Sequence, residues 1–341
     1  MTCPITRYSL TRHSSPRPEE SSSRLALLAA FAAIYLFWGG TFLAIRYAVM
    51  EVPPLLIIAI RCLGGALILY AWMRWRGTLE RATRQQWLTS AIAGAFLFVG
   101  CHGLLAWAEQ RVSSGQAALY LTSTSLWLVL LSATRERRFP QAPVLAGLML
   151  GVIGVALLVS GKDSAGTLLD RLLLIGTGLS WAIGSLIGRE GPRPVSAVQS
   201  TAMQLAAGGL AVLMASIATG ELTGWSVHQI TPRGGFSLVF LVLAGTVLGF
   251  GAYTWLLRVT TPALVGTSSF VNPVVALALG WVAGDEVFSG RTVLAGIVVF
   301  GAVFLIWKGS WSRPKLYRPR TPPLPVSPAA LRALARMRAL L

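Results

Sequence analysis

The amino-acid sequence predicts an all-α integral membrane protein, with ten transmembrane helices arranged as two inverted five-helix repeats. Three observations lead to this fold class. The chain is 54% hydrophobic but only 12% charged, its basic residues gather in alternate connecting segments, and residue patterns of the first half recur in the second. Soluble domains carry about 25% charged residues, so this chain has too little polar surface to cover a globule in water.

Apolar runs separated by short charged clusters follow one another between positions 25 and 308. A helix crosses the hydrocarbon core with about 20 such residues and satisfies its own backbone hydrogen bonds there. The first run continues through Phe37 to Ile45, so we interpret it as an uncleaved helix and not as a signal peptide. The expected spans are 25–45, 53–73, 87–107, 113–134, 141–160, 171–188, 195–219, 235–257, 260–283 and 290–308.

The distribution of Lys and Arg predicts that both termini are cytoplasmic. With the N-terminus inside, 22 of the 29 basic residues fall in inner segments and six in outer loops, while Arg61 lies within a span. This asymmetry obeys the positive-inside rule and accounts for the net charge of +17 without a nucleic-acid-binding face. We therefore expect a multi-pass protein of the cell inner membrane whose partners are the lipid bilayer and a small-molecule substrate, with no nucleic acid. A homodimer is left open.

Several residues of the first half have counterparts in the second, in the same order and at separations that drift only from 143 to 150 positions. Each half holds five spans, and because five is odd the second half enters the membrane from the opposite side. Inverted repeats are typical of secondary transporters, in which the two halves exchange conformations around a central site. The counterparts are Trp38 and Trp181, Arg46 and Arg189, Arg61 and Gln204, Arg111 and Arg258, and Glu136 and Glu286.

The repeat divides the chain into four segments. Residues 1–24 form a polar tail expected to be disordered in the cytoplasm, and residues 309–341 form a basic cytoplasmic tail. Residues 25–160 and 161–308 are the expected first and second five-helix repeats.

The chain resembles the EamA branch of the drug/metabolite transporter superfamily, in particular its YedA-like exporters. The resemblance covers about residues 25–308 and implies two five-helix EamA repeats and a secondary transporter that exports a small metabolite, amino acid or drug. The sequence departs from the family pattern at Ser123 and at Cys101-His102, which weakens any direct transfer of a substrate. The resembling stretches are Ile34 to Thr41, Pro53-Pro54 to Arg61, Ser180-Trp181-Ala182 and Pro262 to Ala276.

Arg61 is the most informative candidate site residue, since it lies about nine residues into its span and so near mid-bilayer. A charge at that depth is expected to face the protein interior or a water-filled cavity. It meets either an anionic group of the substrate or backbone carbonyls that hold the fold. The residues expected to bind substrate are Trp38, Arg61, His102, Tyr120, Trp181, Gln204, Tyr253 and Asn272.

Two further expectations concern the backbone and proton coupling. Gly39-Gly40 and Gly184-Ser185 follow Trp38 and Trp181 and are expected to break those helices beside the site. His102 and Glu109 are the candidates for proton coupling, because His changes charge near neutral pH. A helix-packing His and an interfacial Glu are the alternative. Three small-residue motifs are expected to be helix-packing faces outside the site: Gly147-x-x-x-Gly151, Gly245-x-x-x-Gly249 and Gly280-x-x-x-Gly284.

No cofactor or enzymatic activity is expected. Gly161-Lys162 is followed by Asp163 and position 156 is Ala, so the phosphate-binding loop pattern fails, and no His-Glu-x-x-His motif occurs. The three His residues lie far apart, which disfavours an intramembrane enzyme with a clustered catalytic set. An importer with the same fold, or a membrane receptor or scaffold that transports nothing, remains as the alternative.

Overall fold

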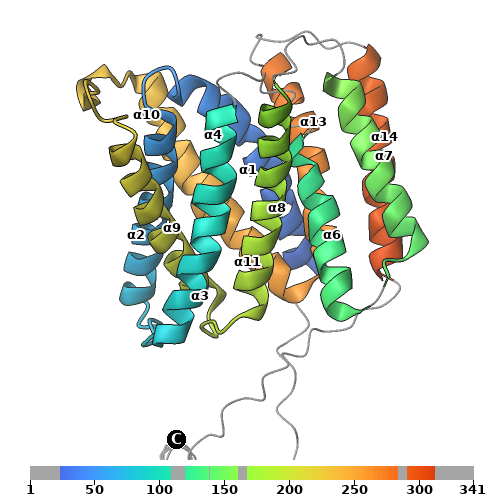
Figure 1. Ribbon diagram of the computed structural model, residues 1–341, viewed down its shortest axis with the longest axis horizontal. Helices are drawn as coiled ribbons and strands as arrows, with labels where there is room; N and C mark the ends of the chain where they lie inside the picture. Colours follow the sequence, from blue (N-terminus) through green and yellow to red (C-terminus); the bar gives the residue numbers. More distant parts are fainter. Residues whose placement is uncertain (1–23, 109–119, 138, 160–166, 283–289, 312–341) are drawn as a thin grey trace, which may run out of the picture.

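The protein is a bundle of helices packed side by side (Figure 1). The computed structural model describes residues 24–108, 120–137, 139–159, 167–282 and 290–311, and within these ranges it contains no β-strand. The helices are α1 (Arg24–Ala48), α2 (Pro54–Trp75), α3 (Arg84–Gly94), η1 (Ala95–Gly103), α4 (Leu104–Ala108), α6 (Ser123–Glu136), α7 (Ala142–Val159), α8 (Leu168–Glu190), α9 (Ala197–Ala218), η2 (Val227–Gln229), α10 (Pro232–Phe240), η3 (Leu241–Phe250), α11 (Gly251–Val259), α12 (Pro262–Gly266), α13 (Ser268–Val282) and α14 (Gly290–Trp311).

Seven helices in the described parts of the chain are long and apolar enough to cross a membrane by length and composition, and 142–157 is a shorter apolar helix. Each of the ten expected spans contains helix in its described part, with ends shifted by up to three residues, and the third is the continuous run 84–108 formed by α3, η1 and α4. The span expected at 113–134 begins outside the described residues. The seven helices are 24–48, 54–75, 168–190, 197–218, 232–259, 262–280 and 293–310.

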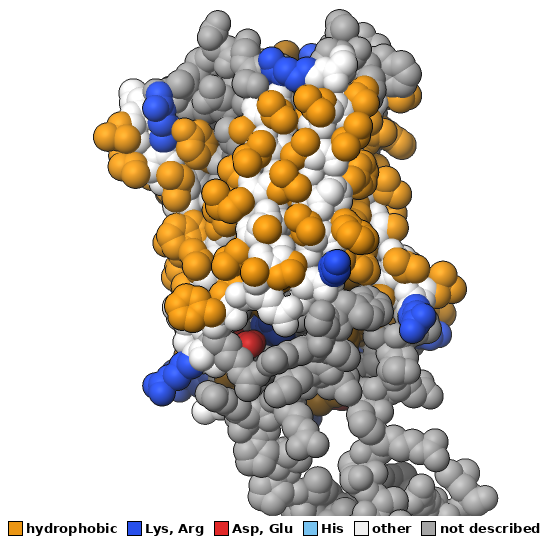
Figure 2. Space-filling view, turned by 90° about the vertical axis from the view of Figure 1, so that its right-hand side faces the viewer, with side chains coloured by type: hydrophobic (Ala, Val, Ile, Leu, Met, Phe, Trp, Pro, Cys, Tyr) orange, Lys and Arg blue, Asp and Glu red, His pale blue; other side chains and the backbone are white. Residues whose placement is uncertain are grey.

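The outer surface is apolar, as a bilayer requires. Figure 2 shows hydrophobic side chains over most of one face, with Lys and Arg toward its ends. Exposed apolar residues on α7 and α14 include Met149, Ile153, Ile297, Phe300 and Phe304, each at least half exposed. Large contiguous apolar surfaces of this kind are rare on soluble monomers and are what lipid tails would cover.

Threonine residues begin several of the helices. The side chains of Thr83 and Thr167 each accept a hydrogen bond from the backbone N–H three residues later. In turn, the side chains of Gln86 and Asp170 accept a hydrogen bond from the backbone N–H of that Thr. This reciprocal arrangement satisfies backbone N–H groups that the first turn leaves unpaired. Helices α3 and α8 therefore begin where the sequence places a Thr three residues before Gln or Asp.

The last helix of each half packs against its counterpart. Along α7, Val144 meets Gly309, Gly147 meets Ile306 and Gly154 meets Val299. Positions that rise along α7 thus fall along α14, so the two helices are antiparallel. Gly147 lies against the backbone and side chains of α14, which confirms it as a helix-packing residue.

Helices α2 and α9, the second helix of each half, are also antiparallel. Glu221, just after α9, accepts hydrogen bonds from the backbone N–H groups of Leu55 and Leu56 at the start of α2, at 3.2 and 3.1 Å. At the other end, Gln199 near the start of α9 exchanges two hydrogen bonds with the backbone of Glu80, which follows α2. Each helix therefore begins beside the segment that follows the other.

The first helix of each half packs against corresponding helices of the opposite half. Helix α1 packs against α13, η3 and α10, while α8 packs against α6, η1 and α3. The third span of both halves contains a π-helix, η1 or η3, in its middle. The contact pattern is therefore preserved when the two halves are interchanged.

Contacts between connecting segments fall into two groups. Glu51 accepts hydrogen bonds from Thr231 and Trp225 donates to the backbone of Glu51, which joins two loops expected outside. At the other end Arg258 donates to the carbonyl of Val195 at 2.8 Å, which joins two loops expected inside. These contacts join only segments that the basic-residue distribution assigns to the same side.

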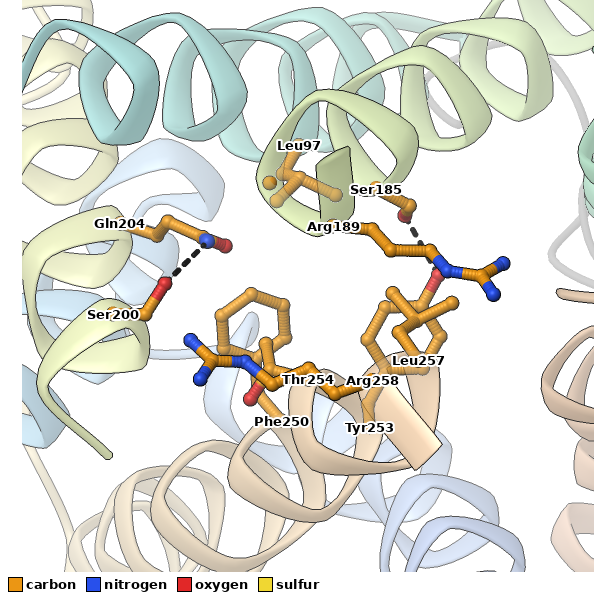
Figure 3. Close-up of a pocket in the computed structure, with 11 residues that line it drawn as sticks. Leu97, Ser185, Arg189, Ser200, Gln204, Phe250, Tyr253, Thr254, Leu257 and Arg258 are labelled. Carbon is orange, nitrogen blue, oxygen red and sulfur yellow. Dashed lines mark hydrogen bonds between the residues drawn. The ribbon is translucent and has the colours of Figure 1, made fainter. Parts of the chain in front are cut away.

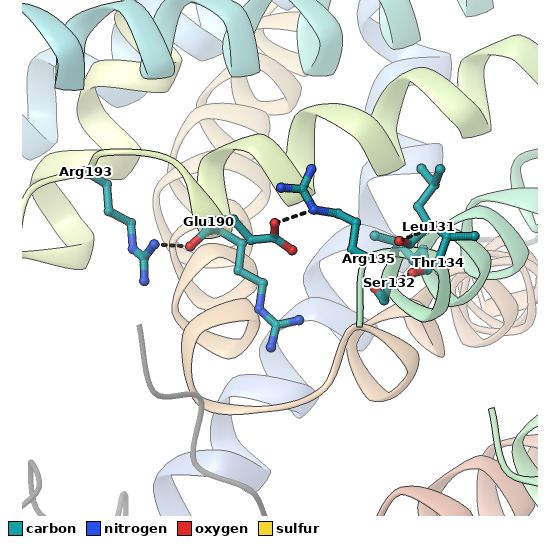
Figure 4. Close-up of polar contacts among 8 residues, drawn as sticks. Leu131, Ser132, Thr134, Arg135, Glu190 and Arg193 are labelled. Atoms are coloured by element: carbon teal, nitrogen blue, oxygen red, sulfur yellow. Dashed lines mark hydrogen bonds and ion pairs between the residues drawn. The ribbon is translucent and has the colours of Figure 1, made fainter. Parts of the chain in front are cut away.

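An ion pair connects α6 to α8 at the end expected inside. Arg135 Nε lies 2.6 Å from a carboxylate oxygen of Glu190 (Figure 4). Beside this pair, Arg193 donates a hydrogen bond to the backbone carbonyl of Arg189, four residues earlier. Because Arg135 is 61% exposed, water weakens this attraction. We expect Arg135→Ala to change the free energy of unfolding by less than about 1 kcal/mol, measured by denaturant unfolding in detergent. A much larger loss would show that this pair holds the helix ends together.

Candidate functional site

Aromatic side chains from both halves meet at the centre of the bundle. The ring centroids of Trp38 (α1) and Trp181 (α8) lie 5.8 Å apart at an angle of 83°. Tyr253 (α11) lies 5.1 Å from Trp38 and 5.5 Å from Trp181, and His102 (η1) lies 5.5 Å from Trp181. Sequence analysis expected these four residues at the site, and the structure brings them together. We call Trp38, His102, Trp181, Phe250 and Tyr253 the aromatic cluster.

Hydrogen bonds fix the polar edges of these rings. Trp181 Nε1 donates to the Tyr253 hydroxyl at 2.7 Å, and that hydroxyl also bonds Ser185 Oγ at 2.7 Å. The indole of Trp38 donates to the backbone carbonyl of Gly245 on η3 at 2.9 Å. Buried Trp and Tyr side chains normally need such partners, so the orientation of each ring in the cluster is constrained.

The glycines of η3 pack against α1, as expected of a helix-packing face, and Gly249 also lies against the Trp38 ring of the aromatic cluster. A Cβ atom on Gly249 would lie 2.7 Å from the indole nitrogen of Trp38, and one on Gly245 would meet the Thr41 side chain. The sequence pattern could not distinguish a face that receives a helix from one that receives an indole ring, since both require small residues.

The expectation of broken helices at the two Trp residues is wrong. Helices α1 and α8 run without interruption through Gly39-Gly40 and Gly184-Ser185. Gly39 packs against Val275, and Gly184 against the backbone of Ala93, so these positions are small because neighbouring helices approach closely. The irregular backbone lies instead in η1 and η3, and π-helical turns are frequent at functional sites.

Each π-helix has one side chain that bonds the carbonyl five residues earlier. His102 Nδ1 lies 2.9 Å from the Leu97 carbonyl oxygen in η1, and Thr246 Oγ1 donates to the Leu241 carbonyl at 2.9 Å in η3. The two side chains are 144 positions apart in the sequence, within the range of the repeat. His102 and Thr246 are therefore structural counterparts. Donation from Nδ1 leaves the Nε2 atom of His102 outside that bond.

Arg61 lies buried beside this cluster. Its Nε donates to Thr246 Oγ1 at 3.0 Å, and its guanidinium lies near Gly245. Gly245 directly precedes Thr246, and its carbonyl accepts the hydrogen bond from Trp38. Among the described residues no carboxylate lies within ion-pair distance of Arg61. Burying a charge without a counter-charge is costly, so the guanidinium is a group that an anion would stabilise.

A crevice lies between the aromatic cluster and the ends of α8 and α11 (Figure 3). It is narrow, with a volume of about 10 Å³, roughly the space that one water molecule needs. The guanidinium groups of Arg189 and Arg258 point to opposite sides, that of Arg258 toward Ser200 (Figure 3), and Tyr253 and Phe250 of the aromatic cluster also line the crevice. The remaining lining residues are Leu97, Ser185, Gly188, Ser200, Gln204, Thr254 and Leu257.

The other expected site residues lie outside the aromatic cluster. Gln204, the counterpart of Arg61, lines the crevice and donates weakly to Ser200 Oγ at 3.4 Å. Tyr120 packs with Leu105, Ala108 and Leu174 in a separate apolar group. Asn272 is 8% exposed, and its side-chain oxygen has no hydrogen-bond partner. Glu109 lies outside the described residues.

Sequence analysis missed Thr246 and Phe250. Thr246 is a single polar residue within an apolar run, and its separation of 144 from His102 is the signal that could have found it. Phe250 stacks against Tyr253 at 6.1 Å and meets Trp181 at 6.2 Å. Nothing in the sequence distinguishes it from an ordinary membrane-facing Phe.

Comparison with known proteins agrees with this architecture. The EamA-like transporter family matches residues 24–160 and 170–308. An Escherichia coli protein described as the uncharacterized inner membrane transporter YedA is 32% identical over 296 residues, covering 85% of this chain and 93% of the relative. Protein PecM of Dickeya dadantii is 25% identical, covering 83% of this chain and 93% of its own.

A solved crystal structure has the same fold. It superposes with a TM-score of 0.71 over 84% of this chain and 98% of its own, at 22% identity. Two matches to one family along the chain, together with several apolar helices, describe a multi-pass membrane protein built from two repeats. The resemblance expected from the sequence is confirmed, and the chain belongs to the EamA-like transporter family.

Proposed function

We propose that this protein is a secondary transporter of the inner membrane that exports a small metabolite, amino acid or drug by alternating access. One observation carries the proposal. The aromatic cluster and Arg61 lie where the first helices of the two halves meet, and a crevice lined by Phe250 and Tyr253 of that cluster lies beside the ends of α8 and α11. A central site between the two halves of an inverted repeat is what alternating access requires.

We infer ten transmembrane helices, in two inverted five-helix repeats, with both termini in the cytoplasm. The antiparallel pairing of α7 with α14 and of α2 with α9 supports inversion, because counterparts in repeats of equal orientation would be parallel. The division of loop contacts into two groups supports the assignment of sides. In this orientation the crevice opens to the cytoplasm.

The exchange of conformation between the halves has a specific consequence. In this state Arg61 bonds Thr246, while their counterparts Gln204 and His102 have other partners. In the opposite-facing state Gln204 takes up the contact with His102, and Arg61 leaves Thr246 to line the outer crevice. Each state would then contain about the same number of central hydrogen bonds, which keeps the two states close in free energy.

The topology can be tested with single cysteines in a background lacking the native Cys residues. Met50 and Pro192 lie in corresponding loops and are exposed. We expect Met50→Cys in intact spheroplasts to react with a membrane-impermeant maleimide, and Pro192→Cys to react only after permeabilisation. Reaction of both before permeabilisation would refute the inverted arrangement, and with it alternating access by repeat exchange.

Transport itself can be tested by a metabolite-resistance screen of an overexpressing strain against empty vector, followed by flux in proteoliposomes. We expect Trp38→Ala to remove the resistance while Trp75→Ala, a matched change of a 79% exposed Trp, preserves it. Binding of the compound without flux in proteoliposomes would favour the receptor alternative. Accumulation in place of resistance would favour an importer.

The driving force is proposed to be a gradient, used either by proton exchange or by facilitated diffusion. His102 is the described candidate for proton exchange because its ring lies in the aromatic cluster. Flux that ignores an imposed pH gradient across proteoliposomes would exclude proton coupling and leave His102 as a packing residue.

A further inference from the structure

A groove lies between α3, α6 and α8, at the end of the bundle where the Arg135–Glu190 ion pair is found. Its volume is about 240 Å³, far more than a water molecule needs. We propose that this groove binds a phospholipid of the adjoining leaflet, which is the cytoplasmic one in the orientation proposed above. The phosphate of that lipid lies at Arg135, a primary ammonium group of its headgroup lies at Glu190, and an acyl chain follows the apolar walls.

The groove opens sideways, toward lipid. Helix α8 lies between α3 and α6 and packs against both, whereas α3 and α6 make few or no contacts with each other (Figure 1). Leu186 and Ile187 of α8 form the floor, and Leu88 and Ile92 of α3 form one wall. Leu88 is 59% exposed and Ile92 is 40% exposed. An acyl chain is the natural occupant, since burial between apolar walls is favourable for apolar surface alone.

The polar end of the groove lies at the depth of the lipid headgroups. Arg135 and Glu190 belong to the last turns of α6 and α8 (Figure 4), where membrane-spanning helices meet the interface. Pockets between such helices that carry basic residues at this depth are suited to headgroups. Arg135 therefore stands where a lipid phosphate would be, and the apolar floor and wall lie beside it.

The ion pair leaves hydrogen-bonding groups for a ligand. It uses Nε of Arg135 and one carboxylate oxygen of Glu190, and the two side chains have no other hydrogen bond or ion pair in the described parts of the chain. The Nη atoms of Arg135 can donate to a phosphate, which guanidinium groups bind through parallel hydrogen bonds. The second oxygen of Glu190 can accept a hydrogen bond from an ammonium group.

The charges of the pair select the headgroup. Because Arg135 and Glu190 together carry no net charge, an anionic headgroup that gains Arg135 also meets the carboxylate, and like charges brought together disfavour binding. A headgroup with a phosphate and a primary ammonium group places an opposite charge at each residue. A choline headgroup has the same charges, but its quaternary nitrogen has no N–H to donate. We therefore expect phosphatidylethanolamine to be favoured over phosphatidylglycerol and phosphatidylcholine.

The experiment is a competition among these three lipids. The full-length protein in detergent is equilibrated with equal amounts of their dioleoyl forms, and native mass spectrometry measures how much of each stays bound. We expect the phosphatidylethanolamine adduct to exceed each of the others at least about threefold, since a partly exposed ion pair changes a binding constant by that order.

Two variants are expected to change the preference in different ways. Glu190→Gln leaves Arg135 as a positive site, so phosphatidylglycerol should become the preferred lipid. Arg135→Gln leaves a lone carboxylate, which should repel phosphatidylglycerol and remove most of the phosphatidylethanolamine adduct. The matched controls are Arg74→Gln and Glu80→Gln, exposed residues at the same end and outside the groove lining, and they should keep the parental preference.

Filling the groove tests the acyl chain separately from the headgroup. We expect Ile92→Trp to lower the retention of all three lipids severalfold, because the larger side chain occupies the groove while the ion pair stays intact. Ile153→Trp is the matched control, since Ile153 is 51% exposed on α7 and lies outside the groove lining. It should retain lipid as the parent does.

Three results would each overturn the inference. They are equal retention of the three lipids by the parent, a parental preference for phosphatidylglycerol, and a Glu190→Gln variant with the parental preference. Unchanged retention by Ile92→Trp would likewise exclude an acyl chain from the groove. None of the groove residues belongs to the aromatic cluster, so these results leave the transport proposal standing.

Discussion

Transport by the Arg61→Ala variant is expected to fall about 10–100-fold below that of the parent, because hydrogen bonds to a charged group contribute about 1.5–3 kcal/mol. Arg61 is 9% exposed, and its Nε donates a hydrogen bond to Thr246 Oγ1 at 3.0 Å. Removing the side chain takes away the positive charge at the aromatic cluster and leaves Thr246 its bond to the Leu241 carbonyl. Initial rates in proteoliposomes, at equal reconstituted protein, measure the loss.

Two further variants separate charge from position. Arg61→Lys keeps the charge but lacks the planar group that bonds Thr246 and a carboxylate together, so we expect it to recover only part of the rate. Thr246→Val keeps Arg61 and removes the hydroxyl that orients it, and we expect a smaller, severalfold loss. If Arg61→Ala transports at the parental rate with normal expression, Arg61 does not belong to the substrate site.

Gly94→Leu and Gly208→Leu are expected to destabilise the folded protein strongly. A Cβ atom on Gly94 would lie 2.7 Å from the Gln204 carbonyl oxygen and 2.9 Å from the Gly208 nitrogen, and one on Gly208 would lie 2.8 Å from the Gly94 oxygen. These neighbours are backbone atoms of α3 and α9, which cannot move without separating the helices. Overpacking typically costs about 1–3 kcal/mol, and we expect the upper end of that range at this contact.

The measurement is the yield of monodisperse protein and its thermal midpoint in detergent. Gly176→Leu on α8 is the matched control, since no atom outside its own helix turns lies within 4 Å of a Cβ built there. We expect the control to purify as the parent does. Equal stability of Gly94→Leu and Gly176→Leu would show that α3 and α9 do not approach as closely as the structure places them.

Much of the fold could be predicted because it depends on short-range patterns. Apolar runs predict helices in lipid, since no other local structure satisfies the backbone there, and each of the ten expected spans contains helix in its described part. Pairs such as Trp38 and Trp181 marked the repeat, and the third helices of the two halves share π-helical turns. The number of membrane crossings and the sidedness of the termini remain proposals.

The candidate site was predicted only in part. Trp38, His102, Trp181 and Tyr253 meet as expected. For Trp38 and Trp181 the reason is that a residue that recurs in both halves tends to lie near the axis relating them. Tyr120 lies in a separate apolar group, since an aromatic residue in a membrane helix has no local feature that distinguishes packing from binding. Thr246 was missed because its importance comes from Arg61, which lies 185 positions away.

By itself, the sequence determined the helical class, the family, the repeat and the residue types of a central site, since each depends on composition or on spacing along one chain. Only the tertiary structure decided that the irregular backbone lies in η1 and η3 and not beside the tryptophans. Only the tertiary structure also shows that Arg61 lies against η3 and that a crevice lies beside Arg189 and Arg258. Those features arise where helices distant in sequence pack together, and packing depends on shape in three dimensions that no local pattern of residues encodes.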